Sequence, residues 1–589
     1  MKKKNLRYLA VNGLFLMIVL GLMNCDKPKI NLEEDSKNSL AKNLRAITRI
    51  SKTDILQDLC PKGMGVSKIE NDMGKAYEND LDNGINDTKQ VDLERKEDIS
   101  MDFRDDLEIM FSDIEHTNSF KEIGHHNPLI AQDFGADPFA MVYGDRVYVY
   151  MTQDQIMYDR EENIIDNNYS MINKLRCISS SDLVNWTDHG WIHVGGIKGA
   201  SLWAKNSWAP SAVWKEINGQ DKFFLYFANG GGGIGVLTAD RPTGPFKDEL
   251  GTALINWETP NCSDVVWMFD PAVLVDDDGR AYIYFGGGIP EGQEEMPNTA
   301  RVIELGPDMM STVGEAVVIG APYLFEDSGI NKIGDTYYYT YCSNFASRTN
   351  AKGKYVPAAG EIIYMTSKNP MGPWEYQGSI LKNPGYFFGS GGNNHHSMIP
   401  FNNNWYMFYH TSLLQDSMGI KGGYRSTHMN QVTVNKDGTI EPIAANKVGV
   451  KQLEALNPYQ NVKATTMSNN AGVKIVEEDK ISFKDPETVS VGEIDNGDWI
   501  LVSGVDFGRK GAETLTIRYS SETEGGAIKV TIDSLEGEAI SYIGINNTGN
   551  FNNFAEVTVP VREVTGVHDI YFTFAGSGYH FNTWSFSKK

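Results

Sequence analysis

Three acidic residues stand at corresponding points of a repeated pattern, and together they could perform acid–base chemistry. Asp137 precedes Pro138, Asp270 precedes Pro271, and Glu326 lies ahead of a strand-forming run in a later repeat. One carboxylic acid can protonate a leaving oxygen, while one carboxylate activates water or acts as a nucleophile. A third acid nearby raises the pKa of the proton donor, because like charge disfavours its ionised form. Cleavage of a glycosidic bond uses this set; the alternative is that each acid only caps a turn.

The segment 269–287 shows which elements must position these acids. After Asp270 and Pro271 it has an apolar run, an Asp-Gly turn and an aromatic-rich run, a pattern typical of a β-hairpin. The second strand of this design recurs five times along the chain. The copies lie at 144–151, 220–228, 279–287, 334–342 and 403–410, and each carries a tyrosine near one position: Tyr150, Tyr226, Tyr284, Tyr341 and Tyr409.

Repeated units of short antiparallel strands indicate a β-propeller, and five copies predict five blades. A sandwich is the alternative, but it would show less self-similarity. Equivalent positions of propeller blades converge on the central axis. The three acids, each at the start of the first strand of its repeat, are therefore expected to meet in one cleft.

Composition narrows the range of partners. The chain has 589 residues and a formal net charge of −24, which argues against a polyanionic nucleic-acid partner and is compatible with neutral ligands. The five cysteines show no metal-binding spacing and no disulfide framework. Cys177, Cys262 and Cys342 are predicted to be buried free thiols.

The N-terminus predicts export. Residues 1–25 have a basic end, a short apolar run and the sequence Leu22-Met23-Asn24-Cys25, which resembles a bacterial lipoprotein signal. Cys25 would then carry lipid and anchor the protein to a membrane of the bacterial cell envelope. Asn24 departs from the small residue usual there, so a cleaved secretion signal is the alternative. Residues 26–122 are polar and highly charged and are interpreted as a spacer.

The segments 127–154, 208–229, 269–287, 324–344 and 395–410 resemble glycoside hydrolase family 43. This resemblance implies that 123–450 is a five-bladed β-propeller of an inverting enzyme acting on arabinose- and xylose-containing polysaccharides, with no cofactor required. It also implies roles for the acids. Asp137 would be the general base that activates water, and Glu326 the general acid. Asp270 would tune the pKa of Glu326 and orient it.

The resemblance extends to a histidine near the propeller axis. His395 matches a residue that accompanies a calcium or water cluster in many members of the family. Calcium prefers oxygen ligands, so a structural or substrate-contacting role is an equal alternative to metal binding. His396 is the competing register for this position.

Four further residues are candidates for contact with substrate. Arg425 matches an arginine that contacts the sugar in some members of the family, and a rim salt bridge is the alternative. Trp203, Trp208 and Phe388 could form the walls of a sugar subsite. Aromatic residues pack in cores more often than they bind sugars, so core positions are the alternative for all three.

Residues 451–589 contain short alternating strands that predict a β-sandwich of the jelly-roll type, and they resemble carbohydrate-binding module family 6. Phe551 departs from the family, which has tryptophan there; a Phe can still stack on a sugar face, but more weakly than Trp. The resemblance implies that Asn582 binds the sugar. The segment 463–465 lacks the acidic residues of the module's usual structural calcium site, which leaves that calcium in doubt. The alternative is a packing domain that has lost sugar binding.

The domain layout and the sequence of residues 179–190 resemble those of the family members that remove side chains from arabinoxylan. The resemblance therefore implies an extracytoplasmic α-L-arabinofuranosidase that removes arabinose side chains from arabinoxylan. A β-xylosidase or endo-xylanase with the same acids is the first alternative. A non-catalytic glycan-binding lipoprotein is the second, and the presence of all three acids argues against it.

Overall fold

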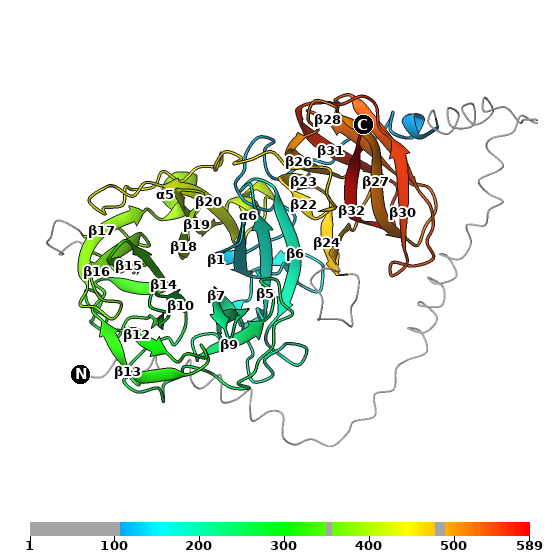
Figure 1. Ribbon diagram of the computed structural model, residues 1–589. Helices are drawn as coiled ribbons and strands as arrows, with labels where there is room; N and C mark the ends of the chain where they lie inside the picture. Colours follow the sequence, from blue (N-terminus) through cyan, green and yellow to red (C-terminus); the bar gives the residue numbers. More distant parts are fainter. Residues whose placement is uncertain (1–105, 349–355, 478–488) are drawn as a thin grey trace, which may run out of the picture. The chain divides into compact units, whose positions relative to one another are not determined.

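The computed structural model describes residues 106–348, 356–477 and 489–589, which are built almost entirely of β-strands (Figure 1). The helices are short, such as α5 (Pro384–Phe388) and α6 (Leu413–Ser417). Within these described ranges, no helix is long and apolar enough to cross a membrane. The predicted signal, the predicted lipidation site Cys25 and residues 26–105 of the predicted spacer lie outside the described residues.

Five antiparallel sheets follow one another along the chain, and each begins with a hairpin of the predicted kind. The first strands are β1 (Ala136–Tyr143), β7 (Trp208–Ile217), β10 (Ala272–Val275), β14 (Leu324–Ile333) and β18 (His396–Phe401). The second strands are β2 (Arg146–Thr152), β8 (Gln220–Ala228), β11 (Ala281–Gly286), β15 (Thr336–Ser343) and β19 (Asn404–Thr411). The outer strands are β5 (Lys174–Ser180), β6 (Trp186–His193), β9 (Ile234–Ala239), β12 (Ala300–Leu305), β13 (Thr312–Ile319), β16 (Ile362–Ser367), β17 (Glu375–Leu381) and β20 (Ser426–Val432).

The five first strands contact one another in cyclic order, from β1 through β7, β10, β14 and β18 back to β1 (Figure 1). Side chains join neighbouring first strands. The backbone N–H of Val273 in β10 donates to Ser211 Oγ in β7 at 3.1 Å, and the N–H of Ala140 in β1 donates to Ser397 Oγ in β18 at 3.0 Å. This ring of strands brings together residues that are far apart in the sequence.

The tyrosines of the second strands explain how neighbouring sheets adhere. Tyr284 is fully buried, and its hydroxyl donates to the carbonyl oxygen of Pro370 in the following sheet at 2.6 Å. Trp374, in the Gly-Pro-aromatic turn after β16, packs edge-on against the same ring. Tyr150 repeats the arrangement and donates to the carbonyl oxygen of Pro242 at 2.6 Å. The repeated aromatic strand and the repeated turn are thus two halves of one contact between sheets.

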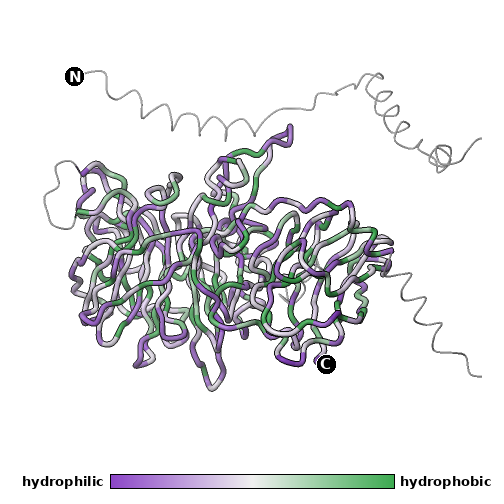
Figure 2. The backbone as a smooth tube through the Cα atoms, turned by 90° about the horizontal axis from the view of Figure 1, so that it is seen from above, coloured by the Kyte–Doolittle hydropathy of each residue, from purple (hydrophilic) through white to green (hydrophobic). Residues whose placement is uncertain are grey.

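The C-terminal region forms two antiparallel sheets that share one apolar core. One sheet has the order β24 (Lys474–Glu477), β25 (Val489–Gly492), β32 (Tyr579–Lys588), β27 (Ala512–Ser521), β30 (Phe554–Pro560). The other has the order β23 (Asn469–Ala471), β26 (Trp499–Asp506), β31 (Val567–Ala575), β28 (Gly526–Ile532), β29 (Ala539–Ile545). Figure 2 shows hydrophobic and hydrophilic residues interspersed along the backbone. In β27, the buried residues Leu515, Ile517 and Tyr519 alternate with more exposed ones, as expected of a sheet with one buried face.

The described end of the predicted spacer, 106–122, packs on these C-terminal sheets. Phe111 is buried against Ala527 and Ala575. Thr117 Oγ1 donates to a carboxylate oxygen of Asp498 at 2.7 Å, and the indole N–H of Trp499 donates to the Thr117 carbonyl at 2.8 Å. This part of the segment is therefore packed structure. Separately, Cys177, Cys262 and Cys342 are buried free thiols, which confirms their prediction.

Candidate active site

The starts of the first strands line one cavity of about 340 Å³ that contains all three predicted acids. Asp137 is the second residue of β1, Glu326 is the third residue of β14, and Asp270 lies two residues before β10. All three side chains are buried. The prediction that the acids meet in one cleft is therefore confirmed. Trp208, His395 and Arg425 line the same cavity.

Asp137 is surrounded by positively polarised groups. Its Oδ1 accepts a hydrogen bond of 2.8 Å from Nη1 of Arg425, and Nδ1 of His410 lies 3.2 Å from the same oxygen. Burial alone would raise the pKa of this carboxyl. The Arg425 guanidinium and His410 outweigh burial and hold the pKa of Asp137 well below its usual range. Asp137 is consequently ionised at neutral pH, the state that a general base requires.

Arg425 owes its position to a buried carboxylate in another sheet. Its Nε donates to Oδ2 of Asp154 at 2.9 Å, and its Nη2 donates to Oδ1 of Asp154 at 2.8 Å. The predicted sugar contact therefore has its guanidinium engaged by two carboxylates, Asp137 and Asp154. Both carboxylates are buried, so Arg425 forms salt bridges inside the fold rather than at its rim, and its contact with a sugar stays a prediction. The ring of Tyr169 lies 4.9 Å from the guanidinium carbon of Arg425 and covers its open side.

Glu326 has the opposite environment. Its Oε1 is buried and has no hydrogen-bond partner among the described residues. Burial raises the pKa of Glu326 well above its usual value, and the neighbouring carboxylates Asp270, Asp137 and Asp327 add to the shift. The shift favours the protonated form of Glu326, the form that a general acid requires.

The environment of Asp270 contains both groups that raise its pKa and a group that lowers it. Burial raises its pKa, and the charge of Asp137 raises it further, whereas a hydrogen bond of 2.9 Å from the backbone N–H of Asp327 to its Oδ2 favours the ionised form. Its charge in turn disfavours ionisation of Glu326. This is the direction expected of a residue that keeps the general acid protonated.

The two adjacent histidines have different roles in the structure. His395 lines the cavity, with Nδ1 at 3.8 Å from Asp137 Oδ1 and 3.8 Å from Asp270 Oδ2, and Nε2 at 3.1 Å from Asp327 Oδ1. His396 instead pairs with Asp327 and with Thr340 behind the cavity wall. His395, and not His396, is therefore the histidine that faces the cavity. Burial lowers the pKa of His395, which favours its neutral ring.

Aromatic side chains form part of the cavity wall. Trp208 lines it as predicted, and its indole N–H donates to the backbone carbonyl of Tyr169 at 2.9 Å. Phe269 and Phe325 line the other side and both contact Trp267 edge-on. Trp203 and Phe388 are not among the lining residues, so their subsite roles are wrong. The indole N–H of Trp203 donates to Asp248, and Phe388 packs against His428.

Several residues of the site were not predicted from the sequence. Asp154 and His410 carry no motif that separates them from other polar residues near strand ends. Tyr169 belongs to a 3₁₀ turn (Tyr169–Met171) between β4 (Ile164–Ile165) and β5, outside the repeats. For Asp327 a signal was available: it is an acid directly before a strand-forming run, like Asp137 and Asp270.

The metal prediction for His395 has no support in the local geometry. Across residues 106–348, 356–477 and 489–589, no group of three or more His, Cys, Asp or Glu side chains is placed to hold a metal ion. Of the two ring nitrogens of His395, Nε2 makes the shorter contact with a carboxylate, to Oδ1 of Asp327. His395 thus acts in this site through its contacts with carboxylates, and calcium remains a prediction.

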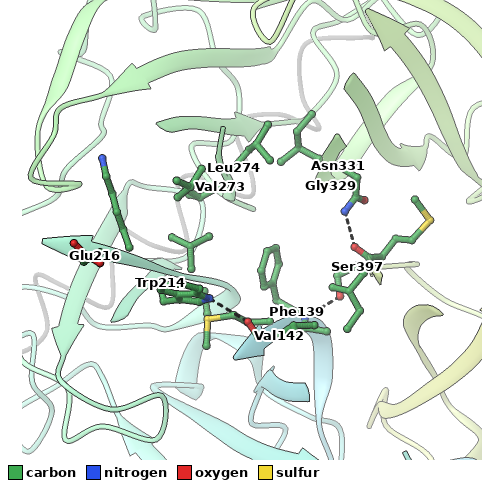
Figure 3. A pocket seen from close by; sticks show the side chains of 18 residues that line it. Phe139, Val142, Trp214, Glu216, Val273, Leu274, Gly329, Asn331 and Ser397 are labelled. Atoms are coloured by element: carbon green, nitrogen blue, oxygen red, sulfur yellow. Dashed lines mark hydrogen bonds between the residues drawn. The ribbon is translucent and has the colours of Figure 1, made fainter. Parts of the chain in front are cut away.

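A second, larger cavity of about 430 Å³ lies further along the same five first strands (Figure 3). Its wall is mainly aliphatic and aromatic, and Phe139, Val273 and Leu274 are among the residues that line it (Figure 3). Glu216 is the one acid among the described residues that line it. A single carboxylate cannot supply both an acid and a base, so the chemistry belongs to the smaller cavity.

The two predicted sugar contacts of the C-terminal sheets already have partners within the protein. The ring of Phe551 stacks on His580, with centroids 3.8 Å apart and planes 8° apart. Asn582 is buried, donates to Ser490 Oγ at 2.9 Å, and accepts a hydrogen bond from Arg518. Sugar binding by this region stays a prediction.

The cavity therefore pairs a carboxyl group whose ionised form is favoured with one whose protonated form is favoured. The environments of Asp137 and Glu326 drive their pKa values apart, which is how one site supplies a base and an acid at the same pH. Such a pair can activate water on one side of a bond and protonate the leaving oxygen on the other.

Comparison with known proteins places these features in families. The model of Glycosyl hydrolases family 43 matches residues 125–440, and that of Carbohydrate binding module (family 6) matches residues 463–588. An arabinoxylan arabinofuranohydrolase of Bacillus subtilis (strain 168) is 47% identical over 490 residues, which cover 80% of this chain and 94% of that protein. An arabinoxylan arabinofuranohydrolase of Paenibacillus polymyxa is 47% identical over 466 residues, covering 77% of this chain and 72% of that protein.

A solved structure also matches over most of the chain. The crystal structure of a glycoside hydrolase family 43 arabinoxylan arabinofuranohydrolase from Bacillus subtilis, in complex with cellotetraose, superimposes with a TM-score of 0.77 at 47% identity. The match covers 80% of this chain and 99% of that chain.

Proposed function

The chain belongs to glycosyl hydrolase family 43, and on that premise we propose that it is an α-L-arabinofuranosidase that removes arabinose side chains from arabinoxylan. One observation carries the proposal: Asp137 and Glu326 face one cavity, in environments that shift their pKa values in opposite directions. The substrate is suggested by the two relatives at 47% identity, both arabinoxylan arabinofuranohydrolases.

We propose an inverting mechanism for the reaction. Asp137 takes a proton from a water molecule as the water oxygen forms a bond to the anomeric carbon. Glu326 gives its proton to the glycosidic oxygen as the bond from that oxygen to the anomeric carbon breaks. Asp270 keeps Glu326 protonated before the reaction, and Arg425 holds Asp137 ionised. The product carries the opposite anomeric configuration, because water attacks from the face opposite the leaving group.

We further propose that the five sheets are the blades of a β-propeller and that the C-terminal sheets form a β-sandwich carbohydrate-binding module. The cyclic contacts of β1, β7, β10, β14 and β18 support five blades. The shared core of the two C-terminal sheets supports the sandwich. In this arrangement the active site lies at one end of the propeller axis.

Product identification tests the activity. The purified protein is incubated with arabinoxylan and, separately, with linear xylo-oligosaccharides, and the released sugars are separated by chromatography. Arabinose alone from the polymer is the expected result. Release of xylose or shorter xylo-oligosaccharides would instead assign a β-xylosidase or endo-xylanase activity, and release of no sugar from either substrate would contradict both activities.

Stereochemistry tests the mechanism independently. Proton NMR of the first product released from an aryl α-L-arabinofuranoside is expected to show the inverted β-anomer before mutarotation. Appearance of the α-anomer first would overturn the water-activating role of Asp137, since retention requires a covalent intermediate with a carboxylate.

We also propose that the enzyme works outside the cytoplasm, anchored to the bacterial cell envelope through lipid on Cys25. The motif at 22–25 supports this, and a cleaved secretion signal is the competing hypothesis. An anchored location fits a polymeric substrate that cannot enter the cell. The enzyme would then have two partners: the polysaccharide, which it binds as substrate, and the membrane, which holds its lipid anchor.

A further inference from the structure

Asp327 occupies the backbone position that Asp137 and Asp270 occupy in their own sheets. All three residues have left-handed backbone angles, with φ of 72° at Asp327, 47° at Asp137 and 50° at Asp270. Each directly precedes the regular part of its first strand, and the ladders of β1 and β14 shift register around this point. The expectation that Glu326 matches the other two acids is therefore off by one residue. Asp327 is a fourth carboxylate, in register with the two aspartates.

Hydrogen bonds join this position to the neighbouring sheets. The backbone N–H of Asp327 donates to Oδ2 of Asp270 at 2.9 Å. The backbone N–H of His396, the first residue of β18, donates to Oδ1 of Asp327 at 3.1 Å. Asp327 thus connects the sheet of Asp270 to the sheet of the two histidines.

The side chain of Asp327 is completely buried and fully engaged. Its Oδ2 lies 2.5 Å from Nδ1 of His396, whose Nε2 lies 2.7 Å from Thr340 Oγ1. Its Oδ1 lies 3.1 Å from Nε2 of His395. These contacts anchor a residue whose backbone conformation is unfavourable for a non-glycine residue, and they hold His395 with Nδ1 toward the cavity.

Glu326 depends on this anchor more than the other acids do. Its buried Oε1 has no hydrogen-bond partner among the described residues. Asp137, in contrast, is bound by Arg425. The direction of the Glu326 side chain is therefore set by its backbone, and the next residue along that backbone is the anchored Asp327.

We propose that Asp327 is a positioning residue for the acid half of the reaction. Its carboxylate, held by His396 and Thr340, fixes the left-handed turn that aims Glu326 into the cavity and presents the N–H that holds Asp270. The inference rests on the proposed glycosidase function. It predicts that loss of the Asp327 carboxylate impairs proton donation to the leaving group while the water-activating side at Asp137 stays intact.

Asp327→Asn is the informative substitution. Asn tolerates the left-handed backbone region as well as Asp does, so the turn remains accessible. Asn has one accepting oxygen where Asp327 uses two, so it can accept from the backbone N–H of His396 or from its Nδ1–H but not from both, and the anchor is weakened. Activity is measured on aryl α-L-arabinofuranosides whose phenols range from acidic to weakly acidic, and on arabinoxylan.

The expected result is a loss that depends on the leaving group. For arabinoxylan and weakly acidic phenols, kcat should fall by about 10- to 100-fold, the usual cost of removing a partner that orients a functional group. For the most acidic phenol, which departs without protonation, kcat should change by less than about 3-fold, and KM should change little throughout. A uniform loss across the series, or no loss, would overturn the proposal.

Ser211→Ala is the matched control. Ser211 is also fully buried, and it also accepts a backbone N–H from the neighbouring first strand, that of Val273. It does not line the catalytic cavity. This variant should lose stability and keep the wild-type dependence on the leaving group. A leaving-group-dependent loss in Ser211→Ala would show that any weakened contact between sheets produces the effect, which would overturn the specific role of Asp327.

Thr340→Val covers the case in which Asp327→Asn does not fold. It removes the hydroxyl that contacts Nε2 of His396 and leaves Asp327 in place. A smaller loss with the same leaving-group dependence is expected, and an unchanged profile would contradict the anchor. If wild-type enzyme cleaves no arabinofuranoside but cleaves aryl β-D-xylosides, the proposed substrate fails, and the same comparison on the xyloside series still tests Asp327.

Discussion

Arg425 and Asp154 face each other through two hydrogen bonds, of 2.9 Å and 2.8 Å, although 271 residues separate them in the sequence. The backbone N–H of Arg425 donates to Asp154 as well, at 2.9 Å. This rigid pairing leaves Nη1 of Arg425 directed at Asp137. The charge state of Asp137, the proposed base, is thus controlled by a residue pair that joins the first sheet to the last.

Arg425→Lys should shift the pH dependence of the reaction. With the guanidinium in place, the pKa of Asp137 lies below its usual range, so the base stays ionised into acidic solution. A lysine cannot maintain both contacts, and burial then raises this pKa. The acidic limb of kcat/KM against pH should move to higher pH by at least about one unit, equivalent to about 1.4 kcal/mol.

Arg301→Lys is the control for this shift. Arg301 is also completely buried, and it binds backbone carbonyls and Asp264 away from the catalytic cavity. Its replacement should change stability without moving the acidic limb. If Arg425→Lys leaves the limb unchanged, or if both variants move it equally, Arg425 does not set the charge of Asp137.

Glu326→Gln should remove proton donation. Gln has nearly the same shape but no acidic proton, so kcat on arabinoxylan should fall by at least about 10²- to 10⁴-fold. Binding of arabinoxylan oligosaccharides, measured by calorimetry, should stay near the wild-type level. Unchanged turnover would exclude Glu326 as the general acid. Glu361→Gln, at another buried glutamate that accepts the backbone N–H of Ala358, should keep wild-type kcat.

Tyr284→Phe should weaken adhesion between sheets without affecting catalysis. It removes the hydroxyl that donates to Pro370 and leaves that carbonyl without this donor. The free energy of unfolding should fall by about 1 kcal/mol, measured by urea titration, with kcat unchanged. Tyr386→Phe is the control, because Tyr386 is 68% exposed and its hydroxyl can bond to water. Equal losses in both variants would show that the hydrogen bond from Tyr284 to Pro370 does not contribute to stability.

Cys25→Ala should release the protein from the membrane. Without the thiol no lipid can be attached, so the protein should move from the membrane fraction to the soluble fraction and lose metabolic labelling with palmitate. Cys60→Ala keeps the motif at 22–25 and should remain in the membrane fraction. A wild-type protein that is soluble and unlabelled would instead establish the cleaved secretion signal.

The repeated hairpins could be predicted because their signals are local. Alternating apolar residues, Asp-Gly turns and aromatic strands appear within segments such as 269–287, and the structure has a hairpin at every predicted copy. Asp137 and Asp270 were recognisable for the same reason, since each stands beside a proline at the start of a strand. Trp203 and Phe388 were predicted wrongly, because whether an aromatic ring faces a core or a cavity depends on neighbours from other sheets.

The sequence by itself thus determined the strand-forming units and the acids at their starts, both of which rest on residues close together in the chain. Only the tertiary structure decided that His395 rather than His396 faces the cavity, that Arg425 is held by Asp154, and that Asp327 is in register with the other aspartates. The physical reason is that closing the ring of first strands brings distant residues into hydrogen-bonding contact. Those long-range contacts set the direction of each side chain and its pKa.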